Sequence, residues 1–188
     1  MPELIFIRHA ESEYNREGIF AGRIDCALTE KGIEQAKNVL RENEKNFDYI
    51  YCSPLKRARQ TLDVIIPNCH PIIDERIIET SIGEWEGKKK DTFDRKILEL
   101  FRNGKYTPPK AETILQIDTR VCSFIETLFN TYKNDERILI VTHNGVMRSI
   151  KRNFIENFDD IMSKNLGIIK LEDKNYRYYL ENKKINKQ

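Results

Sequence analysis

The sequence predicts an α/β fold built around a mostly parallel sheet, and three observations carry that prediction. Short apolar runs alternate with stretches of helical period from the first residues onward. Residues 4–7 are continuously apolar, as in a strand that is covered on both faces. No internal repeat, low-complexity tract or linker interrupts the chain. We therefore expect residues 1–188 to form a single domain, because this length is sufficient for one hydrophobic core.

Capping and turn signals define the elements in the first half of the chain. After the first strand, Thr29 has the pattern of a helix start. Residues 49–52 predict a second strand. Directly after that strand we expect a helix with Ser53 as its N-cap and Pro54 at its first position. Residues 72–73 predict a short third strand.

The second half of the chain continues the alternation. Asp91 is expected to cap a helix. Residues 114–128 have the cleanest helical period in the chain. Residues 138–142 predict another buried strand, and a further helix follows it. Near the end, residues 166–171 and 176–180 flank a polar turn and resemble a hairpin on the edge of the sheet.

The composition bears on partners and location. Lys and Arg number 32 against 30 Asp and Glu, for a net charge of +2, which gives no reason to expect nucleic acid or an anionic membrane as the main partner. No apolar run approaches the about 18 residues that span a bilayer. The start lacks a basic region, so we expect no signal peptide. The four cysteines form no C-x-x-C pair, and we expect reduced thiols in a cytoplasmic protein.

Two of the three histidines follow predicted strands. Arg8 and His9 end the first strand, and His143 ends the strand at 138–142. The helix after Ser53 begins with basic residues that include Arg57. Ligands of open α/β sheets bind outside the carboxyl ends of the strands, so these groups are expected at one edge. Paired arginines and imidazoles suit a phosphate dianion. Taken singly, a histidine after a strand is more often a structural cap; together the groups predict a phosphate pocket.

Five sequence blocks resemble the histidine phosphatase superfamily, which is also called phosphoglycerate mutase-like. The first is Arg8-His9-Ala10-Glu11-Ser12 with Asn15, which is similar to R-H-G-E-S-x-x-N. The other four follow in the order of the family: Gly22-Arg23-Ile24-Asp25 with Leu28-Thr29, Ser53-Pro54-Leu55-Lys56-Arg57-Ala58, Ile77-Ile78-Glu79 with Gly83-Glu84-Trp85-Glu86-Gly87, and Val141-Thr142-His143-Asn144-Gly145-Val146-Met147-Arg148. The resemblance implies a three-layer α/β/α sandwich with a mostly parallel central sheet.

The same resemblance implies a mechanism and a set of site residues. His9 corresponds to the nucleophile that forms a phosphohistidine, and Glu79 to the acid and base. The phosphoryl oxygens are expected to be held by Arg8, Asn15, Arg57 and His143, with substrate contacts at Gly22 and Asn144. No metal or other cofactor is expected. Ala10 and Asn144 stand where the family has glycine, and Ala111-Glu112-Thr113 stands where many members have G-E-S.

The expected activity is hydrolysis of a small phosphorylated metabolite. The α-ribazole phosphate, sugar phosphate, phosphoglycerate and nucleotide classes all stay open. A cofactor-dependent phosphoglycerate mutase is the alternative, although the segment between Gly87 and His143 is short for one. A non-catalytic phosphate-binding module and a nucleic-acid binder that uses the basic tail at 183–187 are weaker alternatives. We expect a monomer or a homodimer.

Overall fold

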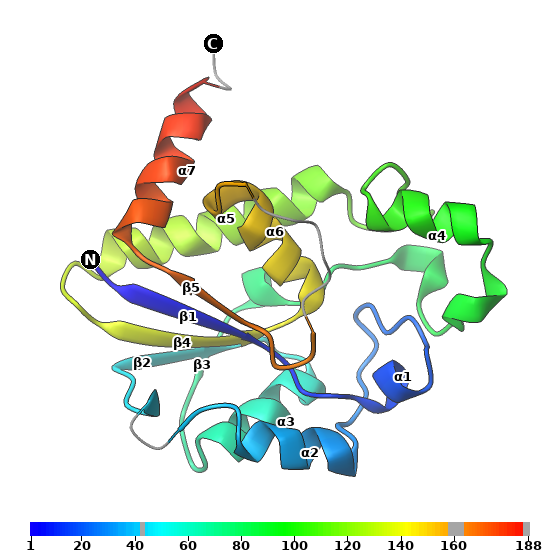
Figure 1. Cartoon of the computed structure of the whole chain (residues 1–188), viewed down its shortest axis with the longest axis horizontal. Coiled ribbons are helices and arrows are strands. Elements are labelled where there is room, and N and C mark those ends of the chain that lie inside the picture. Colours follow the sequence, from blue (N-terminus) through cyan, green and yellow to red (C-terminus); the bar gives the residue numbers. More distant parts are fainter. Residues whose placement is uncertain (42–43, 158–163, 186–188) are drawn as a thin grey trace.

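A five-stranded sheet forms the centre of the computed structural model, which describes residues 1–41, 44–157 and 164–185 (Figure 1). The strand order is β3-β2-β4-β1-β5. Neighbouring strands are parallel except β5, which runs antiparallel to β1 at the edge. The strands are β1 (Glu3–Arg8), β2 (Tyr49–Cys52), β3 (Ile72–Ile73), β4 (Arg137–Thr142) and β5 (Ile168–Leu171).

Helices cover both faces of this sheet, so the expected three-layer sandwich is confirmed. On one face lie α2 (Glu30–Lys37) and α3 (Lys56–Ile65). On the other lie α5 (Ile114–Thr131), α6 (Asn144–Phe154) and α7 (Asp173–Ile185). Two short helices, α1 (Glu13–Arg16) and α4 (Arg95–Arg102), lie outside these layers. Every helix in the described part of the chain is too short or too polar to span a lipid bilayer.

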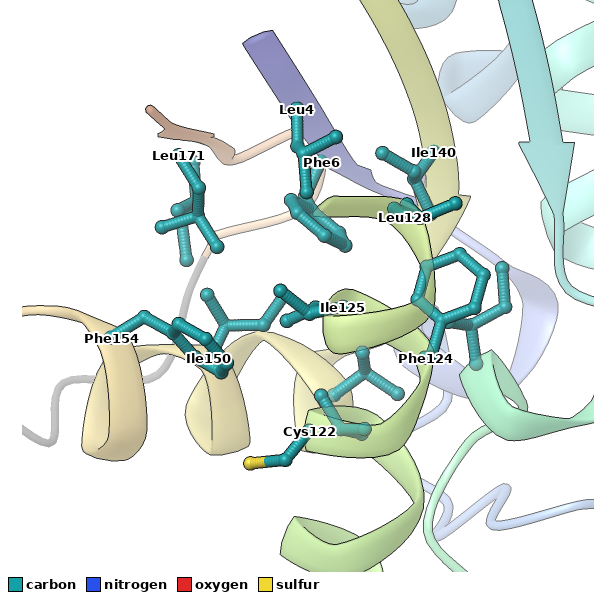
Figure 2. Packing of buried hydrophobic residues seen from close by; sticks show 14 of the residues in the cluster. Leu4, Phe6, Cys122, Phe124, Ile125, Leu128, Ile140, Ile150, Phe154 and Leu171 are labelled. Carbon is teal, nitrogen blue, oxygen red and sulfur yellow. The ribbon is translucent and has the colours of Figure 1, made fainter. Parts of the chain in front are cut away.

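The central strand β1 divides the core between the two faces. Leu4 and Phe6 point to the side of α5 and α6, where they pack with Phe124 and Ile150 (Figure 2). Ile5 and Ile7 point to the side of α2 and α3. Alternate residues of a strand face opposite sides, so both sets are buried and the run 4–7 is apolar throughout.

The predicted hairpin at the end of the chain is wrong. Residues 168–171 do form an edge strand, but the aromatic run after it belongs to α7. Tyr176 stacks on Phe129 and Tyr179 on Phe154, each with ring centroids 4.4 Å apart. Residues three apart share one face in a helix and not in a strand. The aromatic composition favoured a strand, and packing on α5 and α6 selects the helix instead.

Two predicted helix starts are also wrong by a few residues. Helix α3 begins at Lys56 after Leu55, and not with Ser53 as its N-cap. The Ser53 hydroxyl contacts a histidine of the site instead. Helix α4 is capped by Asp94, whose carboxylate accepts from the amide of Lys96, and not by Asp91, which lies in a 3-10 turn.

Candidate active site

Strand pairing brings the two predicted histidines together. β1 and β4 are parallel neighbours, and Arg8 lies opposite Thr142. The amide of His9 donates to the carbonyl of Thr142 at 2.9 Å, which extends the ladder by one residue. The rings of His9 and His143 therefore lie with centroids 5.1 Å apart and planes tilted by 55°. Both side chains are buried.

His9 is held as a neutral imidazole with a defined tautomer. Its Nδ1 lies 2.7 Å from the carbonyl oxygen of Ala10, which only accepts hydrogen bonds, so Nδ1 carries the proton and Nε2 keeps a lone pair. The amide of Ala10 donates to the Thr61 hydroxyl at 3.0 Å, which fixes this segment. Burial, followed by the charges of Arg57 and Arg8, lowers the pKa of His9 well below its ordinary value.

His143 has the opposite arrangement. Its Nε2 lies 2.7 Å from the Ser53 hydroxyl, and that hydroxyl accepts from the amide of Leu55 at 3.4 Å. With the Leu55 amide as donor, the Ser53 proton is free to go to Nε2, and the His143 proton then lies on Nδ1. No described residue accepts from this buried Nδ1. Burial and the charge of Arg57 lower the pKa of His143 as well.

Arg57 is a buried cation at the start of α3. Its Nη1 donates to the Ile24 carbonyl at 2.9 Å and its Nη2 to the Gly22 carbonyl at 2.7 Å. These bonds tie the loop at 22–24 to the helix. Gly22 has a φ angle of +49°, and a Cβ there would lie 2.3 Å from Glu86 Oε1, so a side chain has no room.

The Glu79 carboxylate reaches the start of α6. Its Oε1 accepts from the amide of Thr80 at 2.8 Å and from the amide of Gly145 at 2.9 Å. A Cβ on Gly145 would lie 2.5 Å from this oxygen and 2.0 Å from the Thr80 hydroxyl. The glycine thus lets the carboxylate approach the helix backbone. Burial lowers the pKa of Arg8, and the charge of Glu79 opposes that shift. The two charges are therefore near each other.

Asn15 also fits the site, and so do Ala10 and Asn144, the two residues that replace glycines of the family pattern. The Asn15 Oδ1 accepts from the amide of Ser12 at 3.2 Å and from Asn165 Nδ2 at 3.0 Å, which leaves its own amide nitrogen as a donor. Ala10 and Asn144 are not among the described non-glycine residues with positive φ. Both positions therefore accept a side chain without backbone strain.

These groups surround a pocket of about 200 Å³ at the carboxyl edge of the sheet. Every predicted site residue lines it except His143, whose ring is adjacent to that of His9. The pocket also contains residues that the sequence analysis missed, among them Lys90, Arg102, Glu112, Arg148 and Arg152. A sequence signal for Lys90 does exist, because three consecutive lysines at 88–90 follow the Gly-Glu-Trp-Glu-Gly block.

Aromatic side chains form one wall of the pocket. Phe20 packs against Trp85 with centroids 5.4 Å apart, and Trp85 packs against Tyr106 at 5.6 Å. Phe20 and Tyr106 line the pocket, whereas Trp85 is buried behind them.

In residues 1–41, 44–157 and 164–185 no group of three His, Cys, Asp or Glu side chains has the arrangement of a metal site. All four cysteines are free thiols.

The fold and the pocket define an α/β protein with a pair of buried imidazoles, and the ring of His9 lines one small cavity together with Arg8 and Arg57. The family model of the histidine phosphatase superfamily (branch 1) matches residues 4–186. Phosphoserine phosphatase 1 of Hydrogenobacter thermophilus is 35% identical over 158 residues, which are 80% of this chain and 74% of that protein. A phosphoglycerate mutase of Schizosaccharomyces pombe is 30% identical over 161 residues, 78% of this chain and 76% of that protein.

A solved structure gives the same assignment. A mutant phosphoserine phosphatase from Entamoeba histolytica, in complex with phosphoserine, superimposes with a TM-score of 0.79 at 26% identity over 93% of each chain. The chain belongs to the histidine phosphatase superfamily, and it is an enzyme of the phosphatase class.

Proposed function

We propose that this chain hydrolyses phosphomonoesters of small metabolites through a phosphohistidine at His9. One observation carries the proposal: the bond from Nδ1 to the Ala10 carbonyl leaves the lone pair on Nε2, in a pocket that also contains Arg8 and Arg57. A neutral imidazole is nucleophilic without prior loss of a proton. The lowered pKa of His9, caused by burial and both arginines, keeps it in that form.

The reaction has two steps with Glu79 active in both. First, Nε2 of His9 attacks phosphorus, the ester P–O bond breaks, and the leaving oxygen takes a proton from the Glu79 carboxyl group. Second, water gives a proton to the Glu79 carboxylate and attacks phosphorus, and the P–N bond breaks. The products are the alcohol and inorganic phosphate, and both side chains return to their starting forms.

Fixed donors supply the charge stabilisation for both steps. Arg8 and Arg57 provide guanidinium groups, and Asn15 provides an amide donor. His143 donates from Nδ1, the buried nitrogen that no described residue accepts from. The backbone at Gly22 and Asn144 forms the adjacent parts of the wall and contacts the substrate there.

The preferred substrate carries a carboxylate as well as the phosphate. Lys90 and Arg102 line the pocket in addition to the phosphate-binding groups. Burial and the charges of Arg8 and Arg102 lower the pKa of Lys90, so these cations lie near one another. A second anionic group on the substrate relieves their repulsion. Phosphoserine has such a group, and the Hydrogenobacter and Entamoeba relatives carry its name.

Phosphoglycerate mutase activity is the second candidate. It is favoured by the 30% identity to the Schizosaccharomyces mutase and by the same cations, because a phosphoglycerate also carries a carboxylate. A mutase returns the phosphoryl group to a bound intermediate before water reaches it. Transfer measured with added 2,3-bisphosphoglycerate distinguishes the two activities.

A panel of phosphate esters tests the proposal. The panel contains phosphoserine, phosphoethanolamine, 3-phosphoglycerate, a sugar phosphate and α-ribazole phosphate, each with and without 2,3-bisphosphoglycerate and EDTA. We expect phosphate release from phosphoserine to be fastest and unaffected by EDTA. Binding of phosphate esters without turnover would identify a non-catalytic module, and transfer between phosphoglycerates would identify a mutase.

The remaining expectations stay part of the proposal. We infer one domain over residues 1–188, supported by the family match at 4–186. We also infer a monomer or homodimer in the cytoplasm, without a metal or organic cofactor and without nucleic acid as a partner. The four free thiols support that location. Residues 186 and 187 of the basic tail considered for nucleic acid lie outside the described residues.

A further inference from the structure

Glu79 lies in a stretch of chain without regular secondary structure. It follows a 3-10 turn at Glu75–Ile77 and precedes another at Gly83–Trp85. Carbonyl groups in such a stretch have no ladder or helix to accept from, so other groups must satisfy them. The position of Glu79 therefore depends on contacts from elsewhere in the chain.

Arg120 of α5 supplies two of these contacts. Its Nη1 donates to the carbonyl of Arg76 at 2.7 Å and to that of Ile78 at 2.8 Å. Both carbonyls lie within three residues of Glu79, on its N-terminal side. Arg120 is absent from the pocket wall, so it contacts the site through this backbone and through Glu112, which lines the pocket.

Arg23 and Glu112 hold the other side of the same stretch. Arg23 Nε donates to the carbonyl of Glu79 at 3.0 Å. The amide of Glu112 donates to the carbonyl of Ser81 at 2.9 Å. Together with the bonds from Arg120, the backbone is thus held on both sides of the Glu79 side chain.

One carboxylate connects these donors. Glu112 Oε1 accepts from Arg120 Nε at 2.6 Å, and Glu112 Oε2 accepts from Arg120 Nη2 at 2.9 Å. The same Oε2 accepts from Arg23 Nη2 at 3.3 Å. The Glu112 and Arg120 side chains are only 10% and 15% exposed, so this two-bond contact is shielded from water and fixes the fork of Arg120.

We propose that Arg120 and Glu112 are positioning residues that hold the backbone around Glu79 so that its carboxyl group reaches the leaving oxygen. The inference rests on the proposed function, because it assumes that Glu79 transfers a proton. Proton transfer needs hydrogen-bond distance, and a displacement of about 1 Å costs on the order of 100-fold in rate. Loss of the contacts from Arg120 and Glu112 therefore lowers the rate of proton transfer and leaves the phosphate-binding groups in place.

Arg120→Lys is the main test, because it keeps the positive charge and removes the fork. We measure kcat/KM, which reports the step in which the leaving group departs. For phosphoserine, whose alkoxide needs a proton, we expect a loss of roughly 30-fold. For para-nitrophenyl phosphate, whose anion departs unaided, we expect a change of less than about 3-fold. Glu112→Gln, which retains one acceptor oxygen, should show the same pattern at smaller size.

A double-mutant cycle with Glu79→Gln shows whether Arg120 acts through Glu79. If it does, Arg120→Lys has no further effect on phosphoserine once Glu79 is replaced. The matched control is Glu3→Gln, since Glu3 also bridges two cations, Arg137 and Lys170, at the opposite end of β1. We expect this control to leave both substrates unchanged.

The outcomes separate this inference from the function on which it rests. The proposal that Arg120 and Glu112 position Glu79 is overturned if Arg120→Lys lowers kcat/KM equally for both substrates. It is also overturned if the loss from Arg120→Lys is additive in the Glu79→Gln background. If Glu79→Gln itself slows both substrates equally, the acid role in the proposed function is wrong. A poorly folded Arg120→Lys protein leaves Glu112→Gln and its own double mutant to give the same answer.

Discussion

The imidazole rings of His9 and His143 lie with their centroids 5.1 Å apart, although one follows β1 and the other β4. Burial and neighbouring arginines lower the pKa of both rings. The pair is therefore neutral at physiological pH, with a lone pair on His9 Nε2 and a proton on His143 Nδ1. One ring suits attack on phosphorus, and the other suits donation to a phosphoryl oxygen.

Replacement of His9 by Ala should abolish turnover of every substrate, because no other described group is placed to form the phosphoenzyme. The loss in kcat should be at least about 1000-fold, and the protein should stay folded by circular dichroism. His70→Ala is the control, since His70 is exposed and away from the pocket. A turnover rate in His9→Ala equal to that of the control would exclude the covalent mechanism.

The stability of the protein should fall with acid because of the same two histidines. Their pKa values are lower in the folded than in the unfolded chain, so below about pH 6.5 the unfolded chain binds more protons. Above that pH, the contribution of the two histidines to the free energy of unfolding is constant. As the pH falls further, the free energy of unfolding should drop by up to about 1.4 kcal/mol per pH unit for each histidine.

Urea unfolding at a series of pH values checks this expectation. Carboxylates also titrate in this range, so the informative quantity is the difference between the wild type and His9→Asn or His143→Asn. Each replacement should flatten the decline between about pH 6.5 and 5. Parallel curves for wild type and variants would mean that the histidines are not buried as neutral rings.

Lys90→Met should reduce the preference for substrates that carry a carboxylate. The comparison of phosphoserine with phosphoethanolamine isolates that group. We expect kcat/KM for phosphoserine to fall roughly 10-fold and that for phosphoethanolamine to change little. Lys89→Met is the matched control, because Lys89 is exposed and outside the pocket. Equal losses for both substrates would assign Lys90 to phosphate binding instead.

Gly145→Ala should displace the Glu79 carboxylate. The added Cβ would lie 2.5 Å from Glu79 Oε1 and 2.0 Å from the Thr80 hydroxyl, and both must move. We expect kcat/KM for phosphoserine to fall at least about 10-fold more than that for para-nitrophenyl phosphate. Binding of vanadate, measured by inhibition, should change little. A loss of vanadate binding of equal size would place the effect on the phosphate site.

Local sequence patterns were sufficient for most of the fold. The continuous apolar run at 4–7 and the run at 138–142 predict buried parallel strands, and both are found. The helical period at 114–128 corresponds to α5. These patterns are readable because burial on two faces, or on one helix stripe, restricts residue type at every position. The ends of the strands then predict where His9 and His143 meet.

The remaining features depended on contacts between distant residues. Tyr176 and Tyr179 form a helix because Phe129 and Phe154 lie where a helical face can stack on them. Ser53 bonds to His143 instead of capping α3, because strand order places the two side by side. Arg120 reaches the carbonyls beside Glu79 from another helix. Sequence spacing carries no information on such pairs, since only the folded backbone sets their distance.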